Sequence, residues 1–169
     1  MEFRRAELTD LPEVMKIVTD AIHLLGSQKS PQWQAGYGPD EEKIRTDIVN
    51  QELYVLVEEE MLGIIALVSG VDPVYSAIKN GSWIGNGPYV SLHRVAVAIK
   101  ASGKGVAKQL LRHSIDECIK IGIMDIRIDT HELNIGMQKA ILACGFEFRG
   151  EVCFPIPHGE RKAYQFIPK

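Results

Sequence analysis

The stretch that decides the fold reads YVSLHRVAVAIKASGKGVAKQLLRHSIDECIKI over residues 89–121. Its first part is apolar and rich in β-branched residues, which is typical of a buried strand. Its last part places apolar residues at helical spacing with charged residues between them. Two glycines lie in the loop at residues 102–107 that joins these parts. The stretch therefore predicts a strand, a glycine loop and an amphipathic helix in direct succession.

The glycine loop is suited to bind a phosphate group. The first turn of a helix has backbone N–H groups without partners, and the helix dipole adds partial positive charge there. Gly103 and Gly105 lack the Cβ atoms that would hold a phosphate oxygen away, and Lys104 adds a formal charge. Lys108 excludes the G-x-G-x-x-G dinucleotide pattern, and the nucleoside-triphosphatase loop does not fit either. We expect a diphosphate here, although two glycines at a helix start equally suit a plain turn.

The downstream sequence favours the diphosphate. Asn134 follows a further strand-like run, and an apolar helix-like run separates it from Gly145 and Phe146, with Gly145 eleven residues later. Together with Gly105 and Ala107, this ordered set resembles the GNAT superfamily of acyl-coenzyme A-dependent N-acetyltransferases. The pyrophosphate loop of that family reads Q/R-x-x-G-x-G/A, and its asparagine precedes a Gly-Phe pair at the same spacing.

Two positions depart from the family pattern. Ser102 stands where the family usually has Gln or Arg, which puts one side-chain contact to the pyrophosphate in question, although the backbone donors do not depend on that side chain. Ile141 occupies the position where many members carry a tyrosine thought to protonate the departing thiolate. Any general acid must therefore come from elsewhere in the protein or from water.

The resemblance implies an α/β (α+β) GNAT fold in one N-acetyltransferase domain over residues 2–168. The expected sheet is single, mixed, mostly antiparallel and twisted, with about six or seven strands and about four flanking helices. The family's sheet is splayed between the fourth and fifth strands, where the pantetheine arm enters. Periodicity predicts helices at residues 10–25, 40–50, 106–121 and 134–144, and strands at 3–7, 53–58, 62–69, 89–97, 125–131, 146–154 and 163–167.

The resemblance also implies where acetyl-coenzyme A binds. Main-chain groups of Val95, Ala96 and Val97 would contact pantetheine and the thioester. Asn134 would bind the pantetheine amide or the adenosine side, or simply cap its helix. The pyrophosphate would lie on the glycine loop, formed by Ser102, Gly103, Lys104, Gly105, Val106 and Ala107.

Four aromatic residues in two loops are candidates for binding the acceptor amine: Trp33, Tyr37, Tyr75 and Trp83. Large aromatic side chains on loops either pack against the core or line a binding site. In the GNAT fold the loop after the first helix borders the acceptor site. Asp129 is a further candidate, either for binding a charged acceptor or for an ion pair with Arg94 that ties two strand ends together.

His93 and His131 are the candidate catalytic residues. The incoming ammonium must lose a proton, and histidine titrates nearest neutrality. Both histidines lie on, or at the end of, the strands that would flank the thioester. His93 shares a strand face with Val95 and Val97, whereas His131 lies just past Asp129 on the neighbouring strand. The alternative for each is a hydrogen-bonded residue at a strand end.

We therefore expect an N-acetyltransferase that moves an acetyl group from acetyl-coenzyme A to a primary amine by direct attack in a ternary complex. No metal is expected, and the acceptor is a small-molecule or peptide amine. Ile141 keeps a second reading open, a non-catalytic module of the same fold that senses acyl-coenzyme A. A structural α/β domain with incidental glycines would not explain the downstream spacing.

Composition argues against other classes. A chain of 169 residues with 46% hydrophobic and 24% charged residues suits one globular domain. A net charge of −3 argues against a nucleic-acid partner, and no run approaches the ~20 apolar residues of a membrane span. The three cysteines lack C-x-x-C spacing, which indicates free thiols in the cytoplasm, with Cys118 and Cys144 in the core. Members of the family often form dimers, so the resemblance also allows a homodimer.

Overall fold

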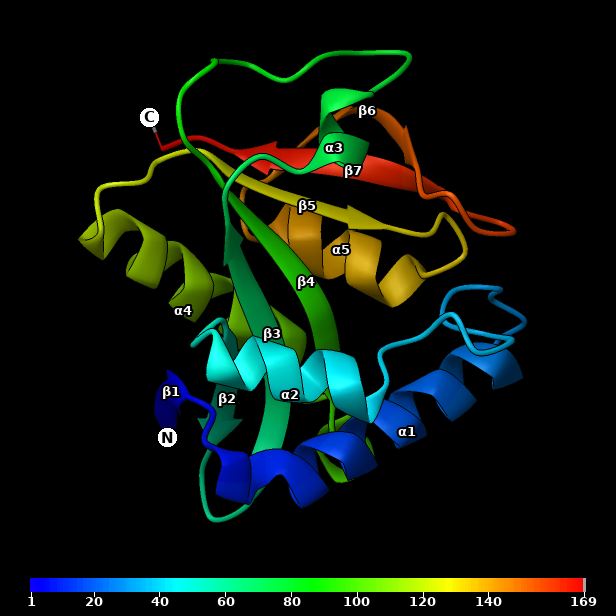
Figure 1. The fold of residues 1–169 in the computed structure, drawn as a ribbon, viewed down its shortest axis with the longest axis vertical. Coiled ribbons are helices and arrows are strands. Elements are labelled where there is room, and N and C mark those ends of the chain that lie inside the picture. The colour runs from blue at the N-terminus through cyan, green and yellow to red at the C-terminus, as the bar shows by residue number, and fades with distance from the viewer. Residues whose placement is uncertain (169) are drawn as a thin grey trace.

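The strand expected at residues 89–97 lies at the centre of a seven-stranded mixed sheet, as the computed structural model of residues 1–168 shows (Figure 1). The strands are β1 (Glu2–Arg5), β2 (Leu53–Val57), β3 (Met61–Ser69), β4 (Val90–Val97), β5 (Ile126–Thr130), β6 (Glu147–Cys153) and β7 (Glu160–Phe166). Their order is β1-β2-β3-β4-β5-β7-β6, and within this range only β4 and β5 run parallel as neighbours. The expected mixed, mostly antiparallel sheet is confirmed.

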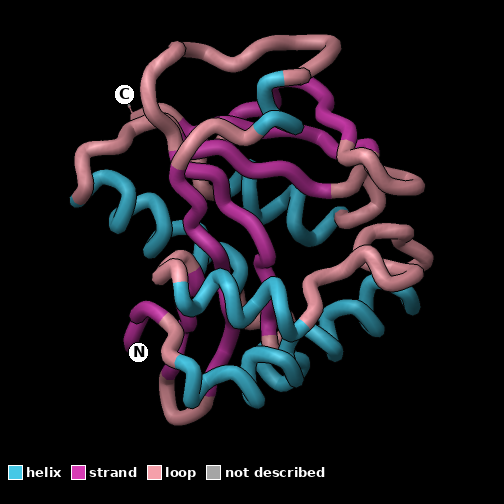
Figure 2. Tube along the Cα trace, in the orientation of Figure 1, coloured by secondary structure: helices cyan, strands magenta, loops and turns pink. Residues whose placement is uncertain are grey.

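Five α-helices flank the sheet in the described part of the chain: α1 (Leu11–Ser27), α2 (Glu41–Val49), α3 (Pro73–Ser76), α4 (Val106–Lys120) and α5 (Ile135–Ala143). Helices α1 and α2 cover one face, and α4 and α5 cover the other (Figures 1 and 2). On α4 the expected apolar stripe is buried against the sheet, including Leu110, Leu111 and Cys118. Cys118 is fully buried in the core, as expected, and this burial raises the pKa of its thiol to about 12. No helix in residues 1–168 combines the length and the apolar character needed to cross a membrane.

Most element boundaries agree with the periodicity, and the exceptions have local causes. Helix α1 continues through Gly26 to Ser27, because the Gln34 side chain packs against Gly26 and donates from Nε2 to the Ile22 carbonyl. The first strand ends at Arg5, since residues 8–10 form a 3₁₀ turn. Strand β7 begins three residues earlier than expected, where it pairs with the end of β6.

The predicted splay between β4 and β5 is confirmed by their register. Within residues 1–168 the two strands pair only over Val90–Leu92 and Ile126–Ile128, yet β4 continues to Val97 and β5 to Thr130. A β-bulge distorts β4 just where the pairing stops, and Arg94 adopts a φ of 54° there. Bulges bend a strand and increase its twist, so β4 turns away from β5.

The bulge also changes which side chains of β4 share a face. His93 lies opposite Ala66 and Ala96 lies opposite Ile64 in the neighbouring strand. Because residues 64 and 66 point to the same side of β3, His93 and Ala96 share a face of the sheet. The expectation that His93 shares a face with Val95 and Val97 was therefore wrong, since it assumed a regular strand.

Candidate active site

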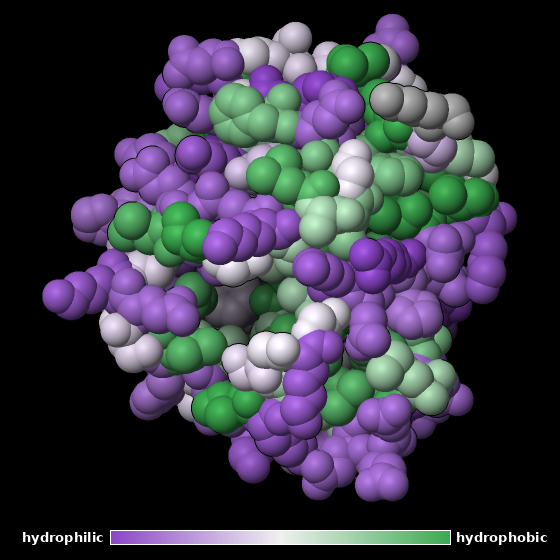
Figure 3. Space-filling view, turned by 180° about the vertical axis from the view of Figure 1, so that it is seen from behind, coloured by the Kyte–Doolittle hydropathy of each residue, from purple (hydrophilic) through white to green (hydrophobic). Residues whose placement is uncertain are grey.

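The splay opens into a cleft of about 960 Å³. Elements from the whole chain contribute to it: the loop between α1 and α2, α2, β4, β5, β7 and the first turns of α4 and α5. Figure 3 shows the surface deeply hollowed on the face opposite to that of Figure 1. Ten of the predicted site residues line this cleft: Trp33, Tyr37, His93, Val95, Ala96, Val97, Ser102, Ala107, Asp129 and Asn134.

The glycine loop has the geometry of an anion site. Gly105 is the N-cap of α4, and Gly103 and Gly105 both adopt a φ of 76°, which favours glycine. A Cβ built on either glycine would meet no atom within 4 Å, so open space lies in front of the loop. In residues 1–168 the amides of Gly103, Gly105, Val106, Ala107 and Lys108 donate to no acceptor. Five unpaired N–H groups at one helix start can therefore bind a phosphate.

The edge of β4 and the start of α5 offer further polar groups. Beyond Leu92, β4 has β3 on one side only, so the backbone groups of Val95–Val97 on the other side face the cleft. The Asn134 side chain caps α5 by accepting from the Met137 amide at 3.3 Å. Its Nδ2 group donates to no acceptor within the described chain and is free to bind a ligand. Capping and ligand binding are thus compatible at Asn134.

His93 is paired with a carboxylate that sequence reasoning missed. Its Nε2 lies 3.4 Å from Oδ2 of Asp72, and its ring packs against Tyr75 with centroids 5.7 Å apart. The imidazole of His93 beside it holds the pKa of Asp72 below its ordinary value. Within residues 1–168 the other ring nitrogen, Nδ1, has no partner. This pair can take up a proton at Nδ1 while Asp72 stabilises the resulting positive charge.

Asp129 lies beside this pair and accepts a 2.6 Å hydrogen bond from the Tyr75 hydroxyl at Oδ2. Burial raises the pKa of Asp129 above its ordinary value. The Tyr75 ring itself is fully buried and does not line the cleft. Tyr75 therefore acts on the cleft through Asp129, whose Oδ1 has no hydrogen-bond donor in the described residues.

The alternative ion pair between Asp129 and Arg94 was wrong. Arg94 Nε instead lies 2.8 Å from Oδ2 of Asp47 on α2, close but not aligned for a hydrogen bond. The positive φ of Arg94 at the bulge directs its side chain toward α2. Burial raises the pKa of Asp47, and the charge of Arg94 opposes that rise. The bulge thus leaves Asp129 without an arginine partner from β4.

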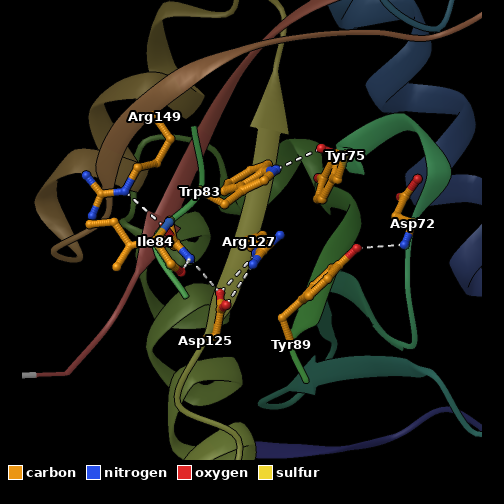
Figure 4. A network of polar contacts seen from close by, with 9 residues as sticks. Asp72, Tyr75, Trp83, Ile84, Tyr89, Asp125, Arg127 and Arg149 are labelled. Atoms are coloured by element: carbon orange, nitrogen blue, oxygen red, sulfur yellow. Dashed lines mark hydrogen bonds and ion pairs between the residues drawn. The ribbon is translucent and has the colours of Figure 1, made fainter. Parts of the chain in front are cut away.

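A network outside the cleft holds the segment at residues 70–89 that carries Asp72 and Tyr75 (Figure 4). The Arg127 guanidinium lies between two aromatic rings, 4.5 Å from the Trp83 centroid and 3.8 Å from that of Tyr89. Trp83 Nε1 donates to the Tyr75 carbonyl at 2.8 Å, and the Asp72 amide donates to the Tyr89 hydroxyl at 2.7 Å. Trp83, expected at the acceptor site, is placed outside the cleft and positions residues that face it.

His131 does not line the cleft either, and it is only 7% exposed. Its Nδ1 accepts from the Leu133 amide at 3.1 Å, and its own amide donates to Oε1 of Gln32 at 3.3 Å. Burial lowers its pKa. The structure thus places His131 where it ties the loop carrying Trp33 and Tyr37 to the end of β5.

Arg161 on β7 is a cleft residue that sequence reasoning missed altogether. Nothing in its local sequence distinguishes it from other charged residues of the chain. Asp72 had only the signal of an aspartate before Pro73, which indicates a helix cap. Both residues reach the cleft because segments distant in sequence meet there.

Comparisons with known proteins agree with this geometry. The profile of the acetyltransferase (GNAT) family matches residues 18–146. A GNAT-family acetyltransferase structure from Streptococcus agalactiae 2603 is 30% identical with a TM-score of 0.91, covering 99% of this chain and 95% of that one. A search of the curated proteins found no match to this chain.

Two further structures share the fold at lower identity. A GNAT-family acetyltransferase from Listeria monocytogenes 4b F2365 is 21% identical, with a TM-score of 0.77 and coverage of 99% and 94%. A ribosomal-protein-alanine N-acetyltransferase from Brucella melitensis is 19% identical, with a TM-score of 0.73 and coverage of 99% and 100%. The profile match spans most of the chain, and the Streptococcus agalactiae 2603 structure is 30% identical over nearly all of it. The chain therefore belongs to the acetyltransferase (GNAT) family.

Proposed function

We propose that the protein is an N-acetyltransferase that moves an acetyl group from acetyl-coenzyme A to a primary amine by direct attack in a ternary complex. One observation carries this proposal. A single cleft is lined both by Ser102 and Ala107, which belong to the glycine loop with the unpaired amides, and by His93 with its carboxylate partner. An anion site and a proton acceptor thus share one continuous space, as direct transfer requires.

The residues present fit acetyl-coenzyme A. The amides of the glycine loop would hold the pyrophosphate, and Lys104 would add a positive charge beside it. The free edge of β4 over Val95–Val97 would bind the pantetheine amides, together with Nδ2 of Asn134. When bound there, the co-substrate supplies the thioester that the amine attacks. Backbone donors of β4 are also available to a developing oxyanion.

His93 would prepare the amine for attack. An ammonium has no lone pair, so a proton must leave before nitrogen bonds to the acyl carbon and the carbon–sulfur bond breaks. Nδ1 of His93 would take this proton, and Asp72 would stabilise the imidazolium. A second proton leaves the nitrogen as the amide forms, so one of the two protons goes to the departing thiolate and the other reaches solvent. The buried Ile141 side chain has no group for that task.

A pair of variants at Ala107 tests the co-substrate site. Ala107 lies in the first turn of α4 and lines the cleft, so Ala107→Glu would place a carboxylate against the diphosphate. Acidic residues are tolerated in the first turn of a helix, so the fold should persist. We expect acetyl-coenzyme A affinity to fall by about a hundredfold or more, measured by calorimetry. Ala107→Gln has the same size without the charge and should retain much more affinity. Equal affinity in both variants would place the site elsewhere.

The buried Ile141 favours one alternative, a GNAT-fold module that senses an acyl-coenzyme A without turnover. Release of coenzyme A across a panel of amines separates the two functions. The panel includes a peptide that begins with alanine, because the Brucella melitensis structure is a ribosomal-protein-alanine N-acetyltransferase. Turnover with any amine supports the enzyme. Tight binding of acetyl-coenzyme A without turnover on any amine would favour the sensor.

A further inference from the structure

We propose that the acceptor is a small amine that carries a carboxylate close to its amino group, of which a free amino acid is the simplest case. Arg161 binds the carboxylate, and Asp129 holds the amino end near His93. The inference rests on the proposed acetyltransferase function and specifies the substrate class of the same cleft. It follows from the surroundings of two charged side chains that line the cleft, the buried Arg161 and the half-buried Asp129.

Arg161 is a buried cation, and only one of its three guanidinium nitrogens donates hydrogen bonds within the described chain. Its side chain lines the cleft, and the residue is 6% exposed. Nη1 donates to the backbone carbonyls of His158 at 2.7 Å and Glu160 at 2.8 Å. Nε and Nη2 donate to no acceptor in residues 1–168, and neither nitrogen is among the fully buried polar atoms without a partner. The guanidinium of this cleft residue therefore has two nitrogens, with three of its five N–H groups, free to bind a ligand.

A buried guanidinium without a carboxylate is costly, because the lost hydration is not replaced. In the described residues no carboxylate oxygen lies within 4.0 Å of Arg161, and its pKa is lowered by burial, with the charge of Asp129 opposing the shift. A carboxylate on the ligand would supply the missing partner, since its two oxygens match the planar fork of arginine. The other arginine of the cleft, Arg94, is already paired with Asp47.

Arg161 and Asp129 lie on the same face of the sheet. Asp129 pairs with Ala163 across β5 and β7, and Arg161 lies two residues before Ala163 on the same strand. Side chains two residues apart on a strand point to the same side. Asp129 has one oxygen on the Tyr75 hydroxyl and the other without a donor. A free cationic fork and a free carboxylate oxygen thus face one cleft, which is the charge pattern that a zwitterion matches.

The apolar residues near Arg161 suit the rest of such a molecule. The Phe154 ring lies 5.8 Å from the guanidinium, and Phe154 and Ile156 both line the cleft. The half-buried Trp33 lines it from the α1–α2 loop. A doubly charged anion such as a phosphate fits less well, because the carboxylates of Asp72 and Asp129 line the same cleft. The surroundings therefore favour a carboxylate with an amine beside it.

The test on the wild-type protein is a competition among matched acceptors. Mixtures of the twenty protein amino acids, of their amides and of the corresponding decarboxylated amines are each incubated with acetyl-coenzyme A. 2-Aminoethyl phosphate is tested beside them, and acetylated products are identified by mass spectrometry. For any side chain that is used, we expect kcat/KM for the acid to exceed that for its amide and amine by about a hundredfold. Equal or better use of amides, amines or the phosphate would overturn the inference and leave the acetyltransferase intact. If no amine gave an acetylated product, both the proposed function and this inference would be contradicted.

Variants of β7 test the role of Arg161. Arg161→Gln should raise KM for the acid acceptor about a hundredfold and leave the affinity for acetyl-coenzyme A unchanged. Arg161→Lys keeps the positive charge but lacks the planar guanidinium, so its KM for the acid acceptor should lie between the values of the wild type and Arg161→Gln. Lys162→Gln removes a charge from the opposite face of the same strand and should behave as wild type. A matching loss with the amide acceptor, or weaker acetyl-coenzyme A binding, would show that Arg161 does not read the carboxylate.

Discussion

The Asp72 carboxylate serves two groups at once. Oδ1 accepts from the Val74 amide at 2.9 Å and so caps α3, while Oδ2 lies 3.4 Å from Nε2 of His93. The cap needs only an oxygen, whereas stabilising a protonated His93 needs the negative charge. These two tasks can be separated by a substitution that keeps the oxygen and removes the charge.

Asp72→Asn is such a substitution. We expect it to retain the fold and to lower kcat by about 10- to 100-fold, because the imidazolium loses its counter-charge. His93→Gln should lower kcat further. In the double variant kcat should match that of His93→Gln alone, since Asp72 acts through His93. Additive losses, measured in steady-state assays with the best acceptor of the panel, would contradict this arrangement.

Among the elements, the start of α1 shows how a few polar contacts define a boundary. Asp10 accepts from both Nη atoms of Arg4, at 2.8 Å and 3.0 Å, and from the Glu7 amide at 2.8 Å. These bonds join β1 to the turn before α1. The bonds from Arg4 are the main reason why the pKa of Asp10 is lower than its ordinary value. An ionised Asp10 therefore stabilises the folded state.

We expect Asp10→Asn to lower the free energy of unfolding by about 1–3 kcal/mol at pH 7. Because the folded-state pKa lies below the unfolded value of about 3.9, the difference is complete above that pH. It should shrink as the pH falls through the folded pKa, when the wild-type carboxylate becomes protonated too. Urea unfolding at pH 7 and at about pH 3 measures both values. Asp116→Asn on the exposed face of α4 is the control and should change little. A difference that is the same at both pH values would contradict the ion pair.

Over the whole molecule, the cleft divides the sheet into two parts that meet along a short seam. Strands β1–β4 and β5–β7 are joined in the described chain by three residue pairs of β4 and β5, and α4 contacts both β4 and α5 behind the seam. A ligand that spans the glycine loop, the edge of β4 and the start of α5 would tie these parts together. Binding only to the folded state must also raise stability through mass action.

Coenzyme A should therefore raise the melting temperature in a concentration-dependent way. At about one hundred times the Kd, binding adds about 2.7 kcal/mol, which corresponds to about 5–10 °C for a chain of this length. Differential scanning fluorimetry measures the shift. Ala107→Glu provides the matched control and should show almost none at the same concentration. An equal shift in that variant would mean that coenzyme A binds outside the cleft.

The sequence by itself determined the elements and the co-substrate loop. Apolar spacing places α4 and β4, and Gly103 and Gly105 indicate unpaired amides at a helix start. The order of the glycine loop, Asn134 and Gly145 was enough to identify the family, because each feature depends on neighbours close in sequence. The splay itself came from that resemblance and not from periodicity.

Only the tertiary structure decided which side chains share the cleft. Asp72, the N-cap of α3, meets His93 on β4, and Tyr75 on α3 meets Asp129 on β5. The bulge at Arg94 reversed the expected alternation of β4 and sent that arginine to α2. Hydrophobic periodicity reports how each segment is buried, but a bulge and a side-chain pairing arise from contacts between segments. The anion site can therefore be predicted from the sequence, whereas the acceptor site is formed by contacts between distant segments and cannot.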